Sequence, residues 1–263
     1  MDYTDYGVCR LSVVPVRAAA ADTSAQTTQL LFGEHYEVTE QTRDRAWLRI
    51  RIAYDQYEGW LDARQHHSVS REYFDYLNRT EFKITTDLTA SILYNKSPIP
   101  ILIGSIIPIS SSELFKMEEQ FAFNGDAKNL GQKREPEFLY KMAYKYLNAP
   151  YQGGGRGPFG IDASGFTQMV AKLCGYTLLR DVWQQANQGR AVKSFQERKM
   201  GDLFFFKDAE GRIVHTGIFQ GGDKIIHASG RVRIDALTEA GIEDFDTKQL
   251  TYAFAHIRRI LPD

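Results

Sequence analysis

The chain shows two kinds of hydrophobic pattern, and the change from one to the other falls near residue 132. Before that point apolar residues alternate with polar ones in short runs, as at Trp47–Ile52, where Leu48, Ile50 and Ile52 share one face. Similar short β-like runs lie at 11–16, 29–38, 57–61, 82–86, 91–94, 99–109 and 120–123. Closely spaced short strands are typical of small β barrels, so we expect one barrel over residues 1–66 and a second over 81–131.

A short helical stretch at 68–77 separates these two barrels, and we assign 67–80 as a helical linker. From residue 132 onward helical periodicity appears. One apolar stripe follows Pro136, which can open a helix, and a second runs over 166–173. The first stripe contains Leu139, Met142, Ala143, Tyr146 and Leu147; the second contains Phe166, Met169, Val170 and Leu173.

Strand-like runs at 201–206, 212–220, 224–229 and 252–257 follow the helices. Helices first and an antiparallel sheet afterwards predict an α+β domain over 132–263. The expected protein is therefore multidomain, with two small all-β barrels in front of an α+β domain.

A glycine-rich loop leads into the second of these helices. Its glycines allow backbone conformations barred to other residues, and Asp162 or Ser164 can cap the helix, which Gly175 can end. Residue 163 then lies at a helix N-terminus, where backbone N–H groups and the helix dipole favour negative charge. A cysteine there would be a thiolate-prone nucleophile, but this chain has Ala163.

Two histidines lie on consecutive predicted strands. If the Gly-Gly-Asp segment at 221–223 turns a tight hairpin, His215 and His227 fall nearly opposite each other, and one imidazole can orient the other. We expect Gly217 to leave room beside His215 for a substrate or partner. Taken alone, His215 also fits a core histidine, and His227 a surface histidine at a strand end.

The last half of the chain resembles the NlpC-type cysteine peptidases of bacterial cell walls. The resemblance rests on the approach loop from Tyr151, on Asp-Ala-Ser-Gly-Phe at 162–166 where the family has Asp-Cys-Ser-Gly-Phe, and on the motifs at 201–206, 215–219 and 226–229. It implies a papain-like α+β domain. The N-terminal strands, which end in Glu-Gly-Trp-Leu at 58–61, are similar to a bacterial SH3-like domain, and a second such domain is expected at 81–131.

The resemblance assigns a role to each catalytic position. It makes His215 the general base and His227 the group that orients it, and it places Tyr151 as an oxyanion donor together with the backbone N–H of residue 163. Tyr151 also fits a tyrosine that serves packing alone. No cofactor is implied, and no Cys/His cluster in the sequence has zinc spacing.

The subset of the family with SH3-like domains takes peptides with a free N-terminal L-Ala followed by γ-D-Glu. The resemblance implies that Asp181 and Tyr57 contact the free amine and that Ser164 contacts the D-Glu carboxylate. Asp181 also fits a helix cap or a solvated charge. The implied partner is L-Ala-γ-D-Glu-L-Lys or its diaminopimelate counterpart, bound by a monomer.

The sequence departs from the family pattern in the amine pocket. Alanines fill 18–21, around Ala19, where related sequences offer an acidic residue near an Arg-x-Glu-Pro motif; Asp22 or Glu58 are the possible substitutes. Val182 stands where some relatives carry a serine, which removes one hydroxyl contact.

Ala163 cannot attack a carbonyl carbon, so the chain as written is expected to be an inactive form of a γ-D-glutamyl-L-diamino-acid endopeptidase of dipeptidyl-peptidase VI type. Either the cysteine was replaced deliberately or the chain is a natural pseudoenzyme that binds peptides without cutting them. The intact set of surrounding site residues favours deliberate replacement. A wall-tethering protein that works through its SH3-like domains, and an acyltransferase or amidase, are the other classes considered.

Composition adds few constraints. A net charge of −1 over 263 residues does not suggest a nucleic acid or an anionic membrane as partner. Cys9 and Cys174 do not form a disulfide framework, and we expect Cys174 to be buried in its helix. The most apolar run, 99–109, is too short and too broken to span a bilayer. A cell-wall substrate favours an exported or periplasmic site after removal of a signal, with cytoplasmic recycling as the alternative.

Overall fold

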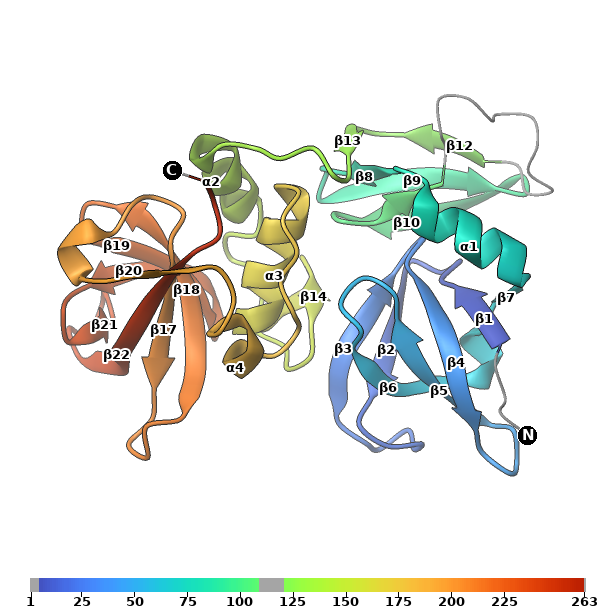
Figure 1. The fold of residues 1–263 in the computed structure, drawn as a ribbon, viewed down its shortest axis with the longest axis horizontal. Helices are drawn as coiled ribbons and strands as arrows, with labels where there is room; N and C mark the ends of the chain where they lie inside the picture. Colours follow the sequence, from blue (N-terminus) through green and yellow to red (C-terminus); the bar gives the residue numbers. More distant parts are fainter. Residues whose placement is uncertain (1–4, 109–120, 263) are drawn as a thin grey trace. The chain divides into compact units, whose positions relative to one another are not determined.

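The computed structural model describes residues 5–108 and 121–262, so positions 109 and 120 of two expected strands lie outside the described residues. The chain divides into two compact units, Met1–Gln132 and Lys133–Asp263 (Figure 1). The finer limits expected inside the first unit, at 66 and 80, remain predictions.

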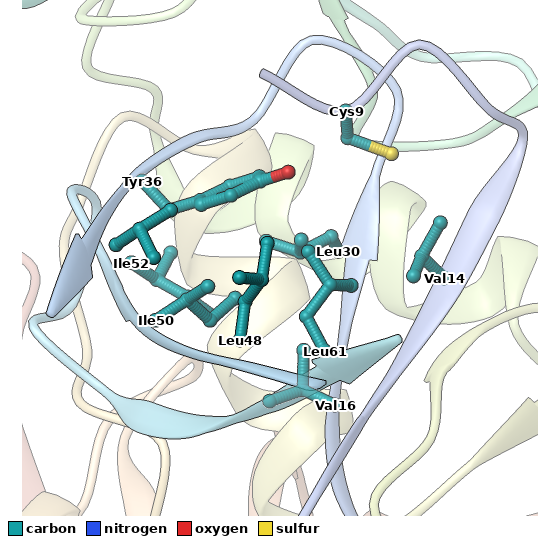
Figure 2. Close-up of a cluster of buried hydrophobic side chains, with 10 residues drawn as sticks. Cys9, Val14, Val16, Leu30, Tyr36, Leu48, Ile50, Ile52 and Leu61 are labelled. Atoms are coloured by element: carbon teal, nitrogen blue, oxygen red, sulfur yellow. The ribbon is translucent and has the colours of Figure 1, made fainter. Parts of the chain in front are cut away.

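The first unit contains a sheet whose strands, as far as the structure describes them, follow the order β3-β2-β6-β5-β4-β1-β7. These strands are β1 Asp5–Val8, β2 Val13–Arg17, β3 Gln26–Leu31, β4 His35–Gln41, β5 Trp47–Ile52, β6 Glu58–Asp62 and β7 Ser68–Val69. The alternation predicted for β5 is confirmed, because Leu48, Ile50 and Ile52 are all buried in one cluster with Tyr36 (Figure 2). The run at 29–38 is two strands, which a turn at Gly33 separates (φ +81°).

The expected linker is only partly helical. Ser68 and Val69 pair with β1, and helix α1 then spans Arg71–Arg79, with the Ser70 hydroxyl accepting from the Tyr73 N–H. The 3-10 helix η1, Ala63–Gln65, precedes β7. Two small sheets follow, of order β10-β9-β12 and β11-β8-β13. Their strands are β8 Lys83–Thr85, β9 Thr89–Tyr94, β10 Ser97–Leu102, β11 Ile106–Ile107, β12 Phe121–Asn124 and β13 Ala127–Asn129.

The second unit has the expected α+β order, with helices α2 and α3 lying on one side of the strands (Figure 1). Its helices are α2 Pro136–Lys145, α3 Ala163–Leu173, α4 Val182–Gln185 and the 3-10 helix η2 Phe195–Glu197. Its strands are β14 Arg156–Gly157, β15 Gly160–Ile161, β16 Arg190–Val192, β17 Leu203–Lys207, β18 Ile213–Gly221, β19 Lys224–Ser229, β20 Arg231–Leu237, β21 Gly241–Glu243 and β22 Leu250–Arg259. Strand β22 pairs with both β17 and β21, which closes β17 to β22 into a ring.

Helix α3 forms as the sequence predicts. Asp162 is its N-cap, and the predicted apolar stripe Phe166, Met169, Val170 and Leu173 is fully buried. The chain leaves the helix at Gly175, whose φ of +80° suits a residue without a side chain. Helix α3 packs against β18, β19 and α2, so the helix that begins at Ala163 lies beside the two strands that bear the histidines.

Two further expectations concern the whole chain. Cys9 and Cys174 are both buried and unbridged, as expected for Cys174. Among the helices of the described residues, none combines the length and the apolar character that crossing a bilayer requires.

Candidate active site

Asp162 fixes the start of helix α3. Its carboxylate accepts the Gly165 N–H at 2.7 Å, as a helix cap does, and the Gly154 N–H of the glycine-rich loop at 2.8 Å. A Cβ on Gly165 would strike the Gly155 carbonyl oxygen, so the loop presses directly on the first helical turn. Ala163 is therefore presented by a tightly packed loop and helix start, as the sequence predicts.

Arg180 lies behind this helix start and was not singled out from the sequence. It is buried (2% exposed), forms an ion pair with Asp162 at 2.7 Å, and donates from Nη1 to the Ser164 hydroxyl at 2.8 Å. The ion pair compensates a guanidinium that would otherwise be costly to bury. Arg180 thus orients the two residues that flank position 163.

His215 and His227 form the histidine pair of the site. Their Nε2 and Nδ1 atoms lie 2.8 Å apart, and both side chains are buried. The partner opposite His227 is Gly217, so His215 lies two residues along on the same face, close to the predicted opposition. Burial shows that the alternative of a surface histidine at position 227 is wrong.

The expectation for Gly217 was room for a substrate or a partner, and in the structure a partner side chain takes that room. A Cβ there would come within 2.9 Å of both the His227 Cβ and the Ile225 side chain. The space beside Gly217 is therefore filled by His227 and Ile225, and it holds no substrate. The glycine instead allows β19 to bring His227 close to His215.

Asp235 extends the histidine pair, and sequence reasoning missed it. Its Oδ2 lies 2.9 Å from His227 Nε2, and its Oδ1 accepts from Arg233 Nη2 at 2.8 Å. In β20, Arg233 lies opposite His227, so Asp235 reaches the imidazole diagonally from two residues on. The signal was the alternating run after Gly230, with Arg231, Arg233 and Asp235 on one set of positions.

The environment sets the protonation of these groups. Burial, and then the neighbouring His227, hold the pKa of His215 well below its ordinary value, so its imidazole is neutral at pH 7. Burial raises the pKa of Asp235, but hydrogen bonds from His227, the Phe245 N–H and Arg233 outweigh this and hold it below the usual range. The hydrogen-bonded row His215–His227–Asp235 therefore has a neutral imidazole, His215, at one end and an ionised carboxylate, Asp235, at the other.

Tyr252 is a third residue, after Arg180 and Asp235, that the sequence did not single out. Its ring stacks on the His215 imidazole, with centroids 3.8 Å apart and planes at 10°, and its hydroxyl lies 3.1 Å from the Ser229 hydroxyl. One face of the base is thus covered by an aromatic ring, which limits how far the imidazole can rotate.

For two other predicted site residues, Tyr151 and Asp181, the structure gives the surroundings of the side chain but does not test the predicted role. Tyr151 is half exposed, and its backbone N–H donates to the Gly230 carbonyl; burial, then Asp162 and Tyr252, raise the pKa of its phenol. Asp181 is the N-cap residue of α4, and its backbone N–H donates to the Gln184 side chain, which fits the cap alternative. The roles given to Tyr151 and Asp181 stay predictions.

Tyr57 belongs to the first unit, where it packs against the cluster around Tyr36 and its N–H donates to the Asp55 carboxylate. Of the two possible substitute acids, Glu58 is held by Arg49 and Arg51 at 3.0 and 2.8 Å, whereas Asp22 is exposed between β2 and β3. An ion-paired carboxylate is a poorer amine ligand, so Asp22 is the better candidate of the two.

A helix start, a buried histidine pair on antiparallel strands and a supporting carboxylate together form the candidate site of this α+β domain. Residues 148–251 match the model of the NlpC/P60 family, and residues 16–65 match that of the bacterial dipeptidyl-peptidase Sh3 domain. The second unit thus carries an NlpC/P60 domain, and a bacterial SH3 domain precedes it.

Two curated relatives match over most of this chain and most of their own length. A γ-D-glutamyl-L-lysine dipeptidyl-peptidase of Bacillus subtilis is 29% identical over 234 residues, which cover 81% of this chain and 76% of the relative. Dipeptidyl-peptidase 6 of Lysinibacillus sphaericus is 26% identical over 241 residues, covering 80% and 84%. The crystal structure of an NlpC/P60 family protein from Bacillus cereus matches with a TM-score of 0.80 at 21% identity, covering 98% of this chain and all of that one, and shows the shared fold.

Proposed function

We propose that this chain is the scaffold of a cysteine peptidase that cleaves the bond between γ-D-Glu and a diamino acid in peptidoglycan peptides. The observation that carries the proposal is the buried 2.8 Å contact between His215 and His227, on strands packed against the helix that begins at residue 163. The names of the dipeptidyl-peptidase relatives support the same bond. With Ala163 in place the chain lacks a nucleophile and does not cleave by thiol chemistry.

In the form with cysteine at 163, His215 takes the thiol proton and the thiolate attacks the γ-carbonyl carbon of D-Glu. The backbone N–H of residue 163 and the Tyr151 hydroxyl donate to the oxyanion. The tetrahedral intermediate collapses to a thioester, and the diamino acid leaves with the proton from His215. Water, activated by His215, then hydrolyses the thioester, which releases L-Ala-D-Glu and restores the thiol.

Substrate selection in this proposal depends on a free amine. Asp181, with Tyr57 from the SH3 domain and Asp22 as the substitute acid, contacts the L-Ala ammonium, while Ser164 contacts the D-Glu carboxylate. A requirement for a free N-terminus confines the enzyme to short turnover peptides. We place it, as a monomer, outside the cytoplasm or in the periplasm, with cytoplasmic recycling as the alternative.

The deciding experiment uses Ala163→Cys. We expect it to release L-Ala-D-Glu from L-Ala-γ-D-Glu-L-Lys or from the diaminopimelate analogue, but not from the N-acetylated peptides, as followed by mass spectrometry. Ala163→Ser is the matched control and should be far slower, since a hydroxyl ionises much less readily than a thiol. Turnover of acetylated and free peptides at equal rates would contradict the amine pocket.

Ala163 itself favours a second candidate, a natural pseudoenzyme that binds muropeptides. Calorimetric binding of the free-amine tripeptide by the unaltered chain, together with no cleavage by Ala163→Cys, would establish it. Cleavage by the cysteine form would instead favour a deliberate replacement at this position.

A further inference from the structure

The hydrogen-bonded row Asp235–His227–His215 has a donor-to-acceptor direction, and Asp235 sets it. An ionised carboxylate only accepts hydrogen bonds, whereas a neutral imidazole has one nitrogen that donates and one that accepts. Asp235 Oδ2 lies 2.9 Å from His227 Nε2, so His227 must carry its proton on Nε2. His227 Nδ1 is then an acceptor, and His215 Nε2, at 2.8 Å, must be the donor.

The direction of these hydrogen bonds decides the protonation of Nδ1, the second ring nitrogen of His215. Because Nε2 of His215 carries the proton, its Nδ1 holds the lone pair that a general base needs. If both tautomers were reversed, Nδ1 of His215 would be protonated and could not take up another proton. The two possible arrangements of the same contacts therefore differ in whether His215 can act as a base.

Burial and hydrogen bonds fix the orientation of the Asp235 carboxylate. It is buried (3% exposed), and its Oδ1 accepts from the Phe245 N–H at 2.9 Å and from Arg233 Nη2 at 2.8 Å. Arg233 is in turn fixed by Asp244 at 2.9 Å, and Asp246 lies 3.8 Å from it. Oδ1 therefore accepts from two donors, whereas Oδ2 faces His227 Nε2 and lies 2.7 Å from Arg233 Nε.

We propose that Asp235 is a positioning residue that fixes the tautomer of His215 through His227 and so leaves Nδ1 of His215 unprotonated for the group at position 163. The catalytic consequence rests on the proposed function, but the tautomers themselves are a property of the chain as it stands with Ala163.

The direct test is nitrogen-15 NMR of histidine-labelled, unaltered protein at neutral pH, in which long-range proton–nitrogen couplings identify the protonated nitrogen of each ring. We expect both His215 and His227 to carry the ring proton on Nε2, with Nδ1 unprotonated. Protonation of either ring on Nδ1, in a neutral or a charged imidazole, would overturn the proposal. This measurement needs no substitution and no catalytic activity.

Asp235→Asn tests the cause. The Phe245 N–H keeps the amide oxygen at the Oδ1 position, whereas Arg233 lies against both positions, so the amide NH₂ faces His227 Nε2 and can only donate to it. We expect both imidazoles to switch to the Nδ1-protonated tautomer. Unchanged tautomers in the folded variant would overturn the proposal. Asp246→Asn, which also removes a charge near Arg233 but does not contact His227, should leave both tautomers as they are.

Activity in the Ala163→Cys background gives the functional readout. Asp235→Asn is expected to lower kcat by about 10³- to 10⁴-fold, as for a triad carboxylate turned to amide, with KM changed little. Retention of kcat within tenfold would remove the catalytic part of the proposal. If Ala163→Cys itself were inactive while the NMR tautomers were as expected, the proposed function would fail and the assignment of Asp235 would stand.

Discussion

Asp162 serves three contacts with one carboxylate. It caps helix α3 through the Gly165 N–H, ties down the glycine-rich loop through the Gly154 N–H, and neutralises the buried Arg180. Loss of a cap costs about 1 kcal/mol, whereas a buried charge left without its partner costs about 3–5 kcal/mol. The ion pair is therefore the larger of the two contributions.

Replacement of this residue separates the two contributions. Asp162→Ala is expected to lower the free energy of unfolding of the second unit by about 3–5 kcal/mol, because Arg180 stays buried without a counterion. Asp162→Asn retains a capping oxygen and should fall between it and the parent. Urea unfolding read by pulsed hydrogen exchange on peptides of residues 133–262 measures both.

A matched control tests whether burial is the reason. Asp223 pairs with Arg198 at 3.3 Å, but its side chain is 81% exposed, so Asp223→Ala should cost less than about 1 kcal/mol. Equal losses at positions 162 and 223 would show that the buried pair has no special weight.

At the scale of elements, the close pairing of β18 and β19 requires a glycine, which has no side chain, at position 217. Gly217 lies directly opposite His227, and the two strands could not keep this register with a methyl group between them. The histidine pair is thus a product of strand pairing as much as of the two side chains.

Gly217→Ala is therefore expected to push His227 away from His215 and to destabilise the second unit by about 1–3 kcal/mol through overpacking. In the Ala163→Cys background it should also lower kcat. The same pulsed-exchange unfolding and a peptide assay measure the two effects. Gly153→Ala, which places its methyl in open space, should change stability far less, and similar losses for both variants would contradict a steric cause.

The sequence predicts those elements whose signals are local. Helix α3 has its cap, its apolar stripe and its terminal glycine within 14 residues, and β5 shows its alternation directly. Asp235 and Tyr252 could not be found this way. Their roles arise because β20 pairs with β19, and because the Tyr252 ring of β22 meets the His215 ring of β18, contacts between segments whose register no local pattern fixes.

The family resemblance supplied what local patterns did not, and it had limits. It indicated His215 and His227, which the structure brings together, but it said nothing of Arg180 behind the helix start. Which group takes the room at Gly217 could not be predicted, because the side chain facing it comes from the neighbouring strand, which a reading along β18 alone does not include.

At the scale of the whole molecule, acid should act on the second unit through its buried histidines. The pKa of His215 is held well below its ordinary value by burial and by His227, and burial also lowers that of His256. Below about pH 6.5 the unfolded chain binds protons that the folded chain does not, so stability falls as pH decreases. Asp235, whose pKa is lowered, loses its contribution only in a separate window below about pH 4.

We expect the free energy of unfolding of the second unit to fall by up to about 1.4 kcal/mol per pH unit for His215 between pH 6.5 and 5. His215→Gln should make this dependence shallower, leaving the part due to His256. Urea unfolding curves at pH 7.5, 6.5 and 5.5 test this. The hydrogen-exchange pulse that reads each curve is applied at one fixed pH, so that the curves can be compared. An identical pH slope in parent and variant would show that His215 is not the titrating group.

The closed ring of β17 to β22 bears on how this protein behaves at high concentration. A sheet that ends in a free strand offers its N–H and C=O groups to another copy, and runaway strand addition of that kind leads to fibrils. In the ring, β21 pairs with the first part of β22, so the strand that would end an open sheet at β21 is covered, and the aromatic strand β17 lies between β18 and β22. Closure of the ring therefore removes the edge at β21 to which a strand of another copy could otherwise add.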